Sequence, residues 1–229
     1  MDQHKANHQS FLAFGKQFTL FIILLLSGQF LGLLLAAIYS QAELFLTINR
    51  LHRPQADTIF KLITHLGDWP ITVGIAIILL FVRYRDSLVI LSTMLYTGFF
   101  TQVLKLIAQH PRPAVYFREL EPIYTIKDYT LQNSLSFPSG HATCIFSLAI
   151  TLSYLWVPQR KRPWLFIIAL IVALSRVYLS QHFFKDILAG SFIGTFFALH
   201  LLWLFENRSN WFHSDKWNGS LRSLFSNLK

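Results

Sequence analysis

Six long apolar stretches constrain the fold of this chain more than any other feature of its sequence. A helix needs about 20 apolar residues to cross the hydrocarbon core of a bilayer, and fewer where its ends snorkel or the bilayer thins. Only 14% of the residues are charged, against roughly 25% in soluble domains, so a bilayer is the expected solvent. The stretches are Phe18–Tyr39, Trp69–Tyr84, Leu88–Ile107, Ala142–Val157, Trp164–Leu179 and Ile187–Phe205.

The apolar stretches predict helices rather than strands. Lipid cannot satisfy free backbone groups, and no period-two alternation favours a barrel. Between the first two stretches, apolar residues recur at helical spacing and predict an interfacial helix; they are Ile59, Leu62, Ile63 and Leu66. The predicted fold is all-α, an integral membrane bundle of six transmembrane helices with one interfacial helix. A single domain is expected over residues 1–229, made of an N-terminal segment 1–17, a core 18–205 and a basic tail 206–229.

The basic residues indicate the orientation and the partners of the chain. Eleven Lys and Arg fall on the side that carries both termini and nine on the other, so the positive-inside rule predicts cytoplasmic termini in a bacterial inner membrane. The net charge of +9 is spread in short clusters between apolar runs. This pattern favours anionic lipid head groups as partners and argues against nucleic acid. Cys144 stands alone, which excludes an intramolecular disulfide and a thiolate metal cage; the oligomeric state is left open.

Three polar clusters fall on the predicted outer side of the membrane, where polar residues are costly unless they have a function. The first is Lys105–Pro113, the second is Pro138-Ser139-Gly140-His141, and the third runs from Ser175 through His182 to Asp186. The segment Gln109–Phe137 is longer than usual connections, and loops of that length are usually functional or disordered. Two acidic residues near the ends of stretches, Glu43 and Asp68, are assigned no role.

The cations of these clusters suit a phosphoryl group. Lys105 and Arg112 are seven residues apart and would share one face of a helix that runs to Pro111. With Arg176 they supply three positive charges, and guanidinium groups match phosphate oxygens bidentately. Ser139 and Gly140 are expected to open the fourth helix, whose free N–H groups and positive dipole end favour an anion.

Two histidines and one carboxylate complete a catalytic set. His182 and Asp186 are four apart and are expected to be neighbours on one helix face. The aspartate would accept a hydrogen bond from one ring nitrogen and leave the other with a lone pair for phosphorus. His141, from a different span, is placed to protonate the departing lipid oxygen. The two imidazoles need opposite protonation states for these roles.

The three clusters resemble the motifs K-x(6)-R-P, P-S-G-H and S-R-x(5)-H-x(3)-D of the type 2 phosphatidic acid phosphatase and vanadium haloperoxidase superfamily, and every motif position is matched. The resemblance covers Lys105 to Asp186 and points to the membrane-bound bacterial lipid phosphatase branch. It implies a phosphohistidine at His182 with Asp186 in support, His141 as general acid, and hydrolysis without a metal ion or other cofactor. By the same resemblance the phosphate oxygens are held by Lys105, Arg112, Ser139, Gly140 and Arg176.

The expected activity is hydrolysis of a membrane lipid phosphate or diphosphate, such as undecaprenyl diphosphate, phosphatidylglycerol phosphate, phosphatidate or a lipid A type glycolipid. The motifs do not separate these substrates, because all share the group that is recognised. Other functions remain open: a phosphotransferase that passes the phosphoryl group to an alcohol, a vanadate-dependent haloperoxidase, and a non-enzymatic binder or transporter of lipid phosphates.

Overall fold

The computed structural model describes residues 9–208, 212 and 214–226, and the regular elements in this part of the chain are helices. Parts of the predicted N-terminal segment (1–8) and basic tail (209–211, 213 and 227–229) lie outside the described residues. The α-helices are α1 (Phe11–Gly15), α2 (Thr19–Ile38), α3 (Gln41–Asn49), α4 (Pro54–Ile63), α5 (Trp69–Leu80), α6 (Tyr84–Ala108), α7 (Pro113–Tyr116), α8 (Gly140–Leu155), α9 (Arg162–Tyr178), α10 (Phe184–Arg208) and α11 (Leu221–Ser226). Short 3-10 turns are η1 (Lys16–Phe18), η2 (Thr64–Gly67), η3 (Gln159–Lys161) and η4 (Asp215–Asn218).

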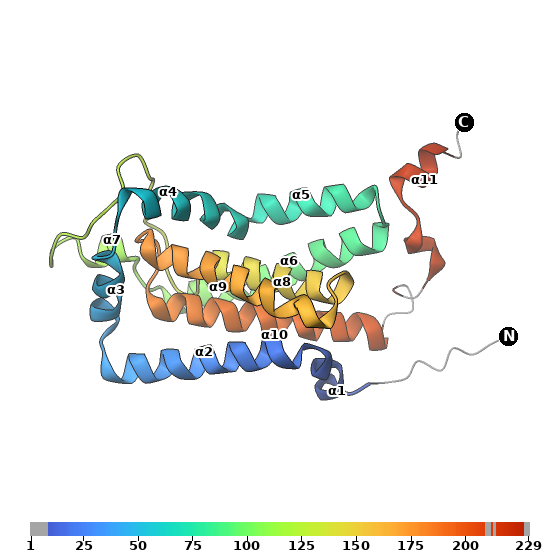
Figure 1. Cartoon of the computed structure of the whole chain (residues 1–229), viewed down its shortest axis with the longest axis horizontal. Coiled ribbons are helices and arrows are strands. Elements are labelled where there is room, and N and C mark those ends of the chain that lie inside the picture. Colours follow the sequence, from blue (N-terminus) through green and yellow to red (C-terminus); the bar gives the residue numbers. More distant parts are fainter. Residues whose placement is uncertain (1–8, 209–211, 213, 227–229) are drawn as a thin grey trace.

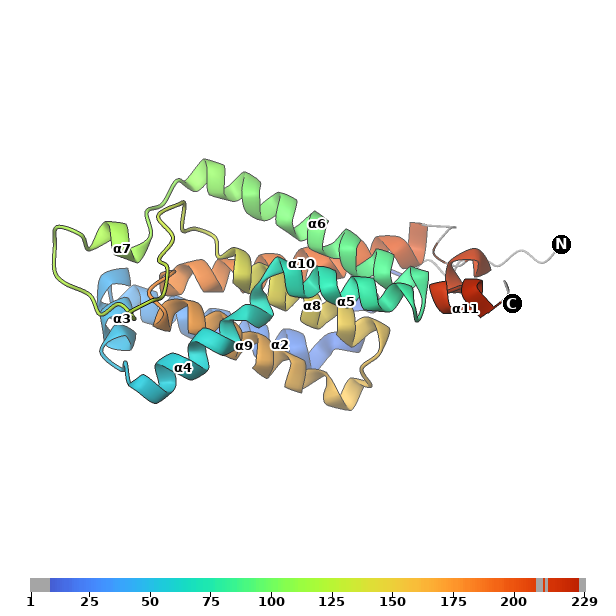
Figure 2. The same ribbon diagram turned by 90° about the horizontal axis from the view of Figure 1, so that it is seen from above.

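Each apolar stretch predicted from the sequence coincides with one helix, namely α2, α5, α6, α8, α9 or α10. The helices run along the long axis of the molecule, with α3 and α7 at one end and α1 and α11 at the other (Figures 1 and 2). The all-α membrane fold is therefore confirmed.

Three helical segments within the described residues are long and apolar enough to cross a membrane: Phe11–Ile38, Tyr84–Tyr116 and Phe184–Arg208. A fourth is obtained if the pair Pro54–Gly67 and Trp69–Leu80, bent by 54°, counts as one span. The predicted interfacial helix is thus present as α4, but it lies end to end with α5 along the bundle (Figure 1). Its position at the membrane boundary stays a prediction.

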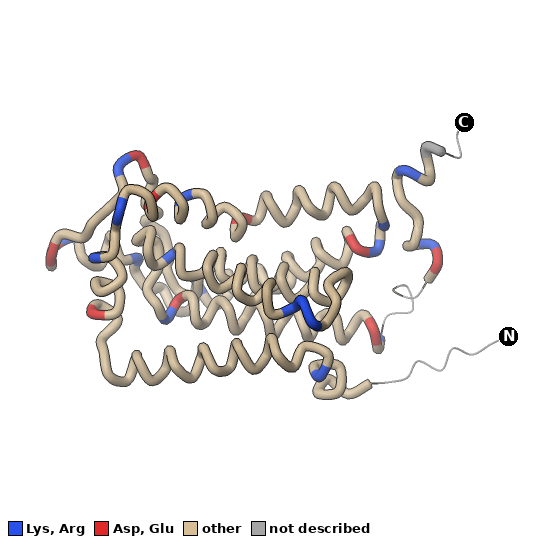
Figure 3. Tube along the Cα trace, viewed as in Figure 1, with Lys and Arg blue, Asp and Glu red and all other residues tan. Residues whose placement is uncertain are grey.

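The surface of the bundle suits contact with lipid. Helix α2 exposes large apolar side chains such as Phe30 at 65% and Leu33 at 66%, which in water would form an unusually large apolar patch. Charged residues concentrate toward the two ends of the bundle (Figure 3). An apolar band between charged ends is what a membrane-spanning bundle requires.

Helix α8 lies at the centre of the bundle and packs against α6, α9 and α10. Its contact with α10 depends on two glycines, because a Cβ at Gly190 would come within 2.5 Å of the Ser139 carbonyl oxygen and a Cβ at Gly194 within 2.4 Å of the Thr143 carbonyl oxygen. Backbone therefore meets backbone where small residues permit it. This close approach fixes the start of α8 against α10.

The variant Gly190→Ala is expected to lose about 1–3 kcal/mol of stability, because the new methyl group must displace the Ser139 backbone. Thermal unfolding in detergent measures the loss. Gly74→Ala in α5 is the matched control, since its Cβ would meet no atom within 4 Å. An equal response of the two variants would contradict the importance of the α8–α10 contact.

Candidate active site

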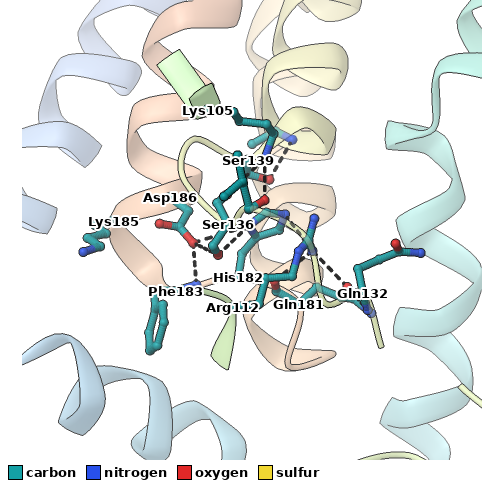
Figure 4. Close-up of polar contacts among 12 residues, drawn as sticks. Lys105, Arg112, Gln132, Ser136, Ser139, Gln181, His182, Phe183, Lys185 and Asp186 are labelled. Carbon is teal, nitrogen blue, oxygen red and sulfur yellow. Dashed lines mark hydrogen bonds and ion pairs between the residues drawn. The ribbon is translucent and has the colours of Figure 1, made fainter. Parts of the chain in front are cut away.

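The three polar clusters meet at the end of the bundle that carries α3 and α7. Lys105 lies on the last turns of α6, Ser139 caps α8, and His182 lies in the connection between α9 and α10 (Figure 4). The segment Gln109–Phe137 contributes backbone and side-chain groups to the same place. A cavity of about 880 Å³ lies at this place, and residues from four parts of the sequence, Lys105, Arg112, His141 and Arg176, line it.

His182 is fully buried, with 1% of its surface exposed. Its Nδ1 lies 3.3 Å from Oδ2 of Asp186, and Arg112 Nη1 lies 3.4 Å from its Nε2. Because Arg112 can only donate, Nε2 must accept, and the proton therefore sits on Nδ1 facing the carboxylate. Burial lowers the pKa of His182 to about 3, so the imidazole is neutral at physiological pH. The Nε2 lone pair is directed at Arg112.

Asp186 Oδ2 collects three donors. Besides His182 it accepts hydrogen bonds from the Ser136 hydroxyl at 2.5 Å and from the backbone N–H of Phe183 at 2.9 Å. The carboxylate is therefore held in one orientation (Figure 4). His182 precedes α10 rather than lying on it, so the predicted placement of the pair on one helix face is wrong. The contact forms because the turn before α10 folds back over the first turn of that helix.

Lys105 and Arg112 are held by loop carbonyl groups. Lys105 Nζ donates to the Leu135 carbonyl oxygen at 2.9 Å, and Arg112 Nε donates to that of Ser134 at 3.1 Å. Helix α6 ends at Ala108, and Gln109 adopts a left-handed conformation. The prediction that both cations share a helix face is therefore wrong, since the residue before Pro111 disfavours helix. The two charges converge through the segment 134–136 instead.

Arg176 is the third cation, on α9, and only 4% of it is exposed. Its Nη1 donates to the hydroxyls of Thr64 at 2.8 Å and Tyr129 at 3.2 Å, while its buried Nε has no partner. Among the described residues, no carboxylate lies within ion-pair distance of any of the three cations. The cavity wall thus carries positive charge that no ion pair neutralises, which suits an anionic ligand.

Ser139 and Gly140 begin α8, as the sequence predicts. The Ser139 side chain caps the helix by accepting from the Ala142 N–H at 3.4 Å, and its own N–H donates to the Asp186 carbonyl oxygen at 3.0 Å. A Cβ at Gly140 would meet nothing within 4 Å, so the backbone there borders open space. The first N–H groups of a helix lack intrahelical partners and favour an anion.

His141 follows on the first turn of α8 and lines the same cavity as Arg112 and Arg176. Its Nε2 lies 2.5 Å from Oδ1 of Asp68. Because Arg112 also contacts His182, both histidines lie at the same end of the bundle. Asp68 was left without a role in the sequence and is brought to the site by the bend between η2 and α5.

Two further residues were missed by sequence reasoning. Ser136 bonds Asp186, and Gln181 accepts a hydrogen bond from Arg112 at 3.0 Å through Oε1. Gln181 directly precedes His182, which was the one signal available for it. Ser136 has no such signal, since only the folding of the long loop brings it near Asp186.

The sequence profile of the PAP2 superfamily matches residues 86–210, a segment that contains all three polar clusters and more than half of the chain. The chain belongs to the PAP2 superfamily. The expected family assignment is thereby confirmed.

Two of the similar curated proteins are named as phosphatases. The chain is 26% identical over 161 residues to the lipid A 4'-phosphatase of Porphyromonas gingivalis, covering 67% of this chain and 68% of the relative. It is 26% identical over 172 residues to dolichyldiphosphatase 1 of Dictyostelium discoideum, covering 69% of each. The crystal structure of Aquifex aeolicus LpxE superimposes with a TM-score of 0.62 at 27% identity, covering 70% of this chain and 93% of that one.

Proposed function

We propose that this PAP2 protein is a membrane phosphatase that removes the phosphate of a lipid phosphate or diphosphate through a phosphohistidine on His182. The observation that carries the proposal is the neutral, buried imidazole whose Nε2 faces Arg112. A nucleophile and a cluster of unneutralised cations beside one cavity suit attack on a phosphoryl group. The relatives support a lipid substrate, since their names give lipid A and dolichyl diphosphate.

In the proposed first step, Nε2 of His182 attacks phosphorus, and the bond from phosphorus to the lipid oxygen breaks. The cations Lys105, Arg112 and Arg176, with the N–H groups at Ser139 and Gly140, stabilise the charge on the phosphoryl oxygens. His141 gives a proton to the departing oxygen. Asp186 stabilises the charge that appears on the His182 ring through Nδ1.

In the second step, water attacks the phosphohistidine and inorganic phosphate leaves. His141, now neutral, takes the proton of the water as it attacks, so both groups return to their starting states. The described residues contain no group of three or more His, Cys, Asp or Glu arranged to hold a metal ion. The proposal routes no step through a metal, as the motif resemblance implies.

The proposed topology is a single domain over residues 1–229 with six spans, in a bacterial inner membrane. Positive-inside counting supports cytoplasmic termini and a site that faces the periplasm or the outside. Helices α8 and α9, of 16 and 17 residues, are shorter than an isolated span requires. Their burial within the bundle supports counting them as spans, because neighbouring helices replace lipid around them.

Phosphate release by the purified protein from a panel of lipid phosphates and diphosphates in detergent tests the function. Turnover is expected to persist in excess EDTA, and adding acceptor alcohols separates hydrolysis from phosphotransfer. Reversible loss of turnover on chelation would contradict the metal-independent scheme. Binding of the lipids without release of phosphate would indicate the non-enzymatic alternative.

A further inference from the structure

A second carboxylate–imidazole pair joins His141, of the second motif, to Asp68, which lies outside the three sequence motifs. Oδ1 of Asp68 lies 2.5 Å from Nε2 of His141, and its Oδ2 lies 2.8 Å from Nδ1 of His65. The His141 side chain is 27% exposed and the Asp68 side chain is 32% exposed. The carboxylate therefore bridges two imidazoles at the edge of the cavity.

The position of Asp68 depends on Gly67, the residue before it. A Cβ at Gly67 would come within 3.2 Å of the Cβ and carbonyl oxygen of His141 and within 3.0 Å of the Cγ1 of Val172. The η2 turn can approach α8 and α9 this closely because glycine has no side chain. This approach carries the Asp68 side chain to the ring of His141.

A purely structural role for Asp68 is disfavoured by its hydrogen bonds. Asp68 is the N-cap residue of α5, where aspartate commonly accepts from the first backbone N–H groups. Its side chain makes no capping hydrogen bond. Both carboxylate oxygens are directed to histidines instead.

The other charged groups that face His141 are Arg112, from the connection after α6, and Arg176, from α9. Both are positive and oppose a further positive charge on the imidazole. Asp68 supplies the opposite charge, together with a hydrogen bond to one ring nitrogen. A proton donor beside two guanidinium groups needs such a partner.

His141 also borders a second, largely apolar groove. This groove, of about 520 Å³, is lined by large side chains that include Trp69, Leu95 and Phe99. No Lys or Arg is among the described residues that line it, and its one carboxylate is Asp68. An alkyl group fits this groove, whereas a second phosphate would meet negative charge without a cation.

We propose that Asp68 is a positioning residue that keeps the proton on His141 for transfer to the alkoxide of a lipid phosphomonoester. This inference rests on the proposed phosphatase function. With Nε2 held by Asp68, Nδ1 is the nitrogen free to donate. As the bond from phosphorus to oxygen breaks, its electron pair takes the Nδ1 proton of the His141 imidazolium, and the ring becomes neutral with its Nε2–H bonded to Asp68.

The test compares leaving groups that differ in their need for a proton. The leaving group of dodecyl phosphate is an alkoxide, which needs the proton. The leaving group of p-nitrophenyl phosphate is a phenolate, which is stable without it. Asp68→Asn is expected to lower kcat for dodecyl phosphate by about 100-fold, the lower range of general acid catalysis, and to lower kcat for p-nitrophenyl phosphate only about threefold. Dodecyl diphosphate, whose leaving group is a phosphate ester, should follow the aryl substrate.

Two further variants separate this role from folding. Glu119→Gln removes an exposed carboxylate of the long loop that does not line the cavity, and should leave both rates unchanged. Gly67→Ala keeps the carboxylate but forces η2 away from His141. It should therefore reproduce the selective loss with the alkyl substrate.

Equal losses with the alkyl and aryl substrates in Asp68→Asn would overturn the inference, as would an unchanged rate with dodecyl phosphate. A wild-type preference for dodecyl diphosphate over dodecyl phosphate would overturn the assignment to monoesters. Failure of the wild-type protein to release phosphate from any of the three substrates would instead refute the proposed function itself.

Discussion

Replacing His182 by alanine is expected to lower kcat for a lipid phosphate by at least about 10⁴-fold, the scale seen when a catalytic nucleophile is removed. The cations and the helix N-terminus remain in this variant, so substrate binding should change far less than kcat. The fall measures the loss of the neutral imidazole whose lone pair faces Arg112. Phosphate release from detergent micelles gives the rate.

The matched control is His110→Ala. His110 is another imidazole of the same region, exposed and stacked edge-on to Phe137 at 6.0 Å between ring centroids, and its loss should cost little. Brief incubation of the wild-type protein with labelled substrate, followed by denaturation, should trap an acid-labile phosphoryl group on the protein. A His182→Ala variant that still formed this adduct would assign the nucleophile to another residue.

The pH dependence follows from the burial of His182. Its pKa lies well below the usual value of 6.5, at about 3, so the nucleophile is lost only as the pH falls through that range. Between about pH 5 and 8 His182 stays neutral. Loss of activity as the pH rises then reports deprotonation of His141, the proposed general acid.

The helices of the bundle were predictable because their apolar runs are long and continuous. Six predicted stretches coincide with helices, and each boundary lies within four residues of the observed one. The run from Phe18 to Tyr39 is the closest match, since α2 (Thr19–Ile38) leaves large apolar side chains exposed along its length and the apolar run ends where the helix ends. The bend between η2 and α5 was not predicted, because hydropathy does not record the direction of a helix.

The chemical identity of the site was predictable because the motifs carry several residue types at fixed spacing. Its geometry was less so. Both predictions that placed pairs on one helix face were wrong, since α6 ends before Arg112 and α10 begins after His182. The pairs meet through loop carbonyls and a folded-back turn, which depend on contacts distant in sequence.

The partners of the catalytic groups were the least predictable part. Ser136 contacts Asp186, which is 50 positions away in the sequence. Asp68 contacts His141, which is 73 positions away. Their contacts depend on the path of the long loop and on the absence of a side chain at Gly67. Neither feature has a local pattern in the sequence.

Replacing Asp186 by asparagine is expected to lower kcat by about 10³- to 10⁴-fold while leaving the fold intact, by analogy with loss of the carboxylate in a catalytic triad. An amide can turn its NH₂ toward His182 Nδ1, which would then accept and move the ring proton to Nε2. The lone pair would no longer face phosphorus. The amide also lacks the negative charge that stabilises the ring when it becomes positive in the phosphohistidine.

The contacts of Ser136 provide the control for this variant. Ser136→Ala removes one donor to Asp186 Oδ2, at 2.5 Å, but keeps the carboxylate and the Phe183 N–H bond, so a loss of only about 10-fold is expected, the scale of one hydrogen bond. Phosphate release by the two variants, with thermal unfolding to verify folding, gives the comparison. Equal losses in both would mean that the carboxylate orients the site without setting the tautomer of His182, because only Asp186→Asn exchanges an acceptor for a donor at Nδ1.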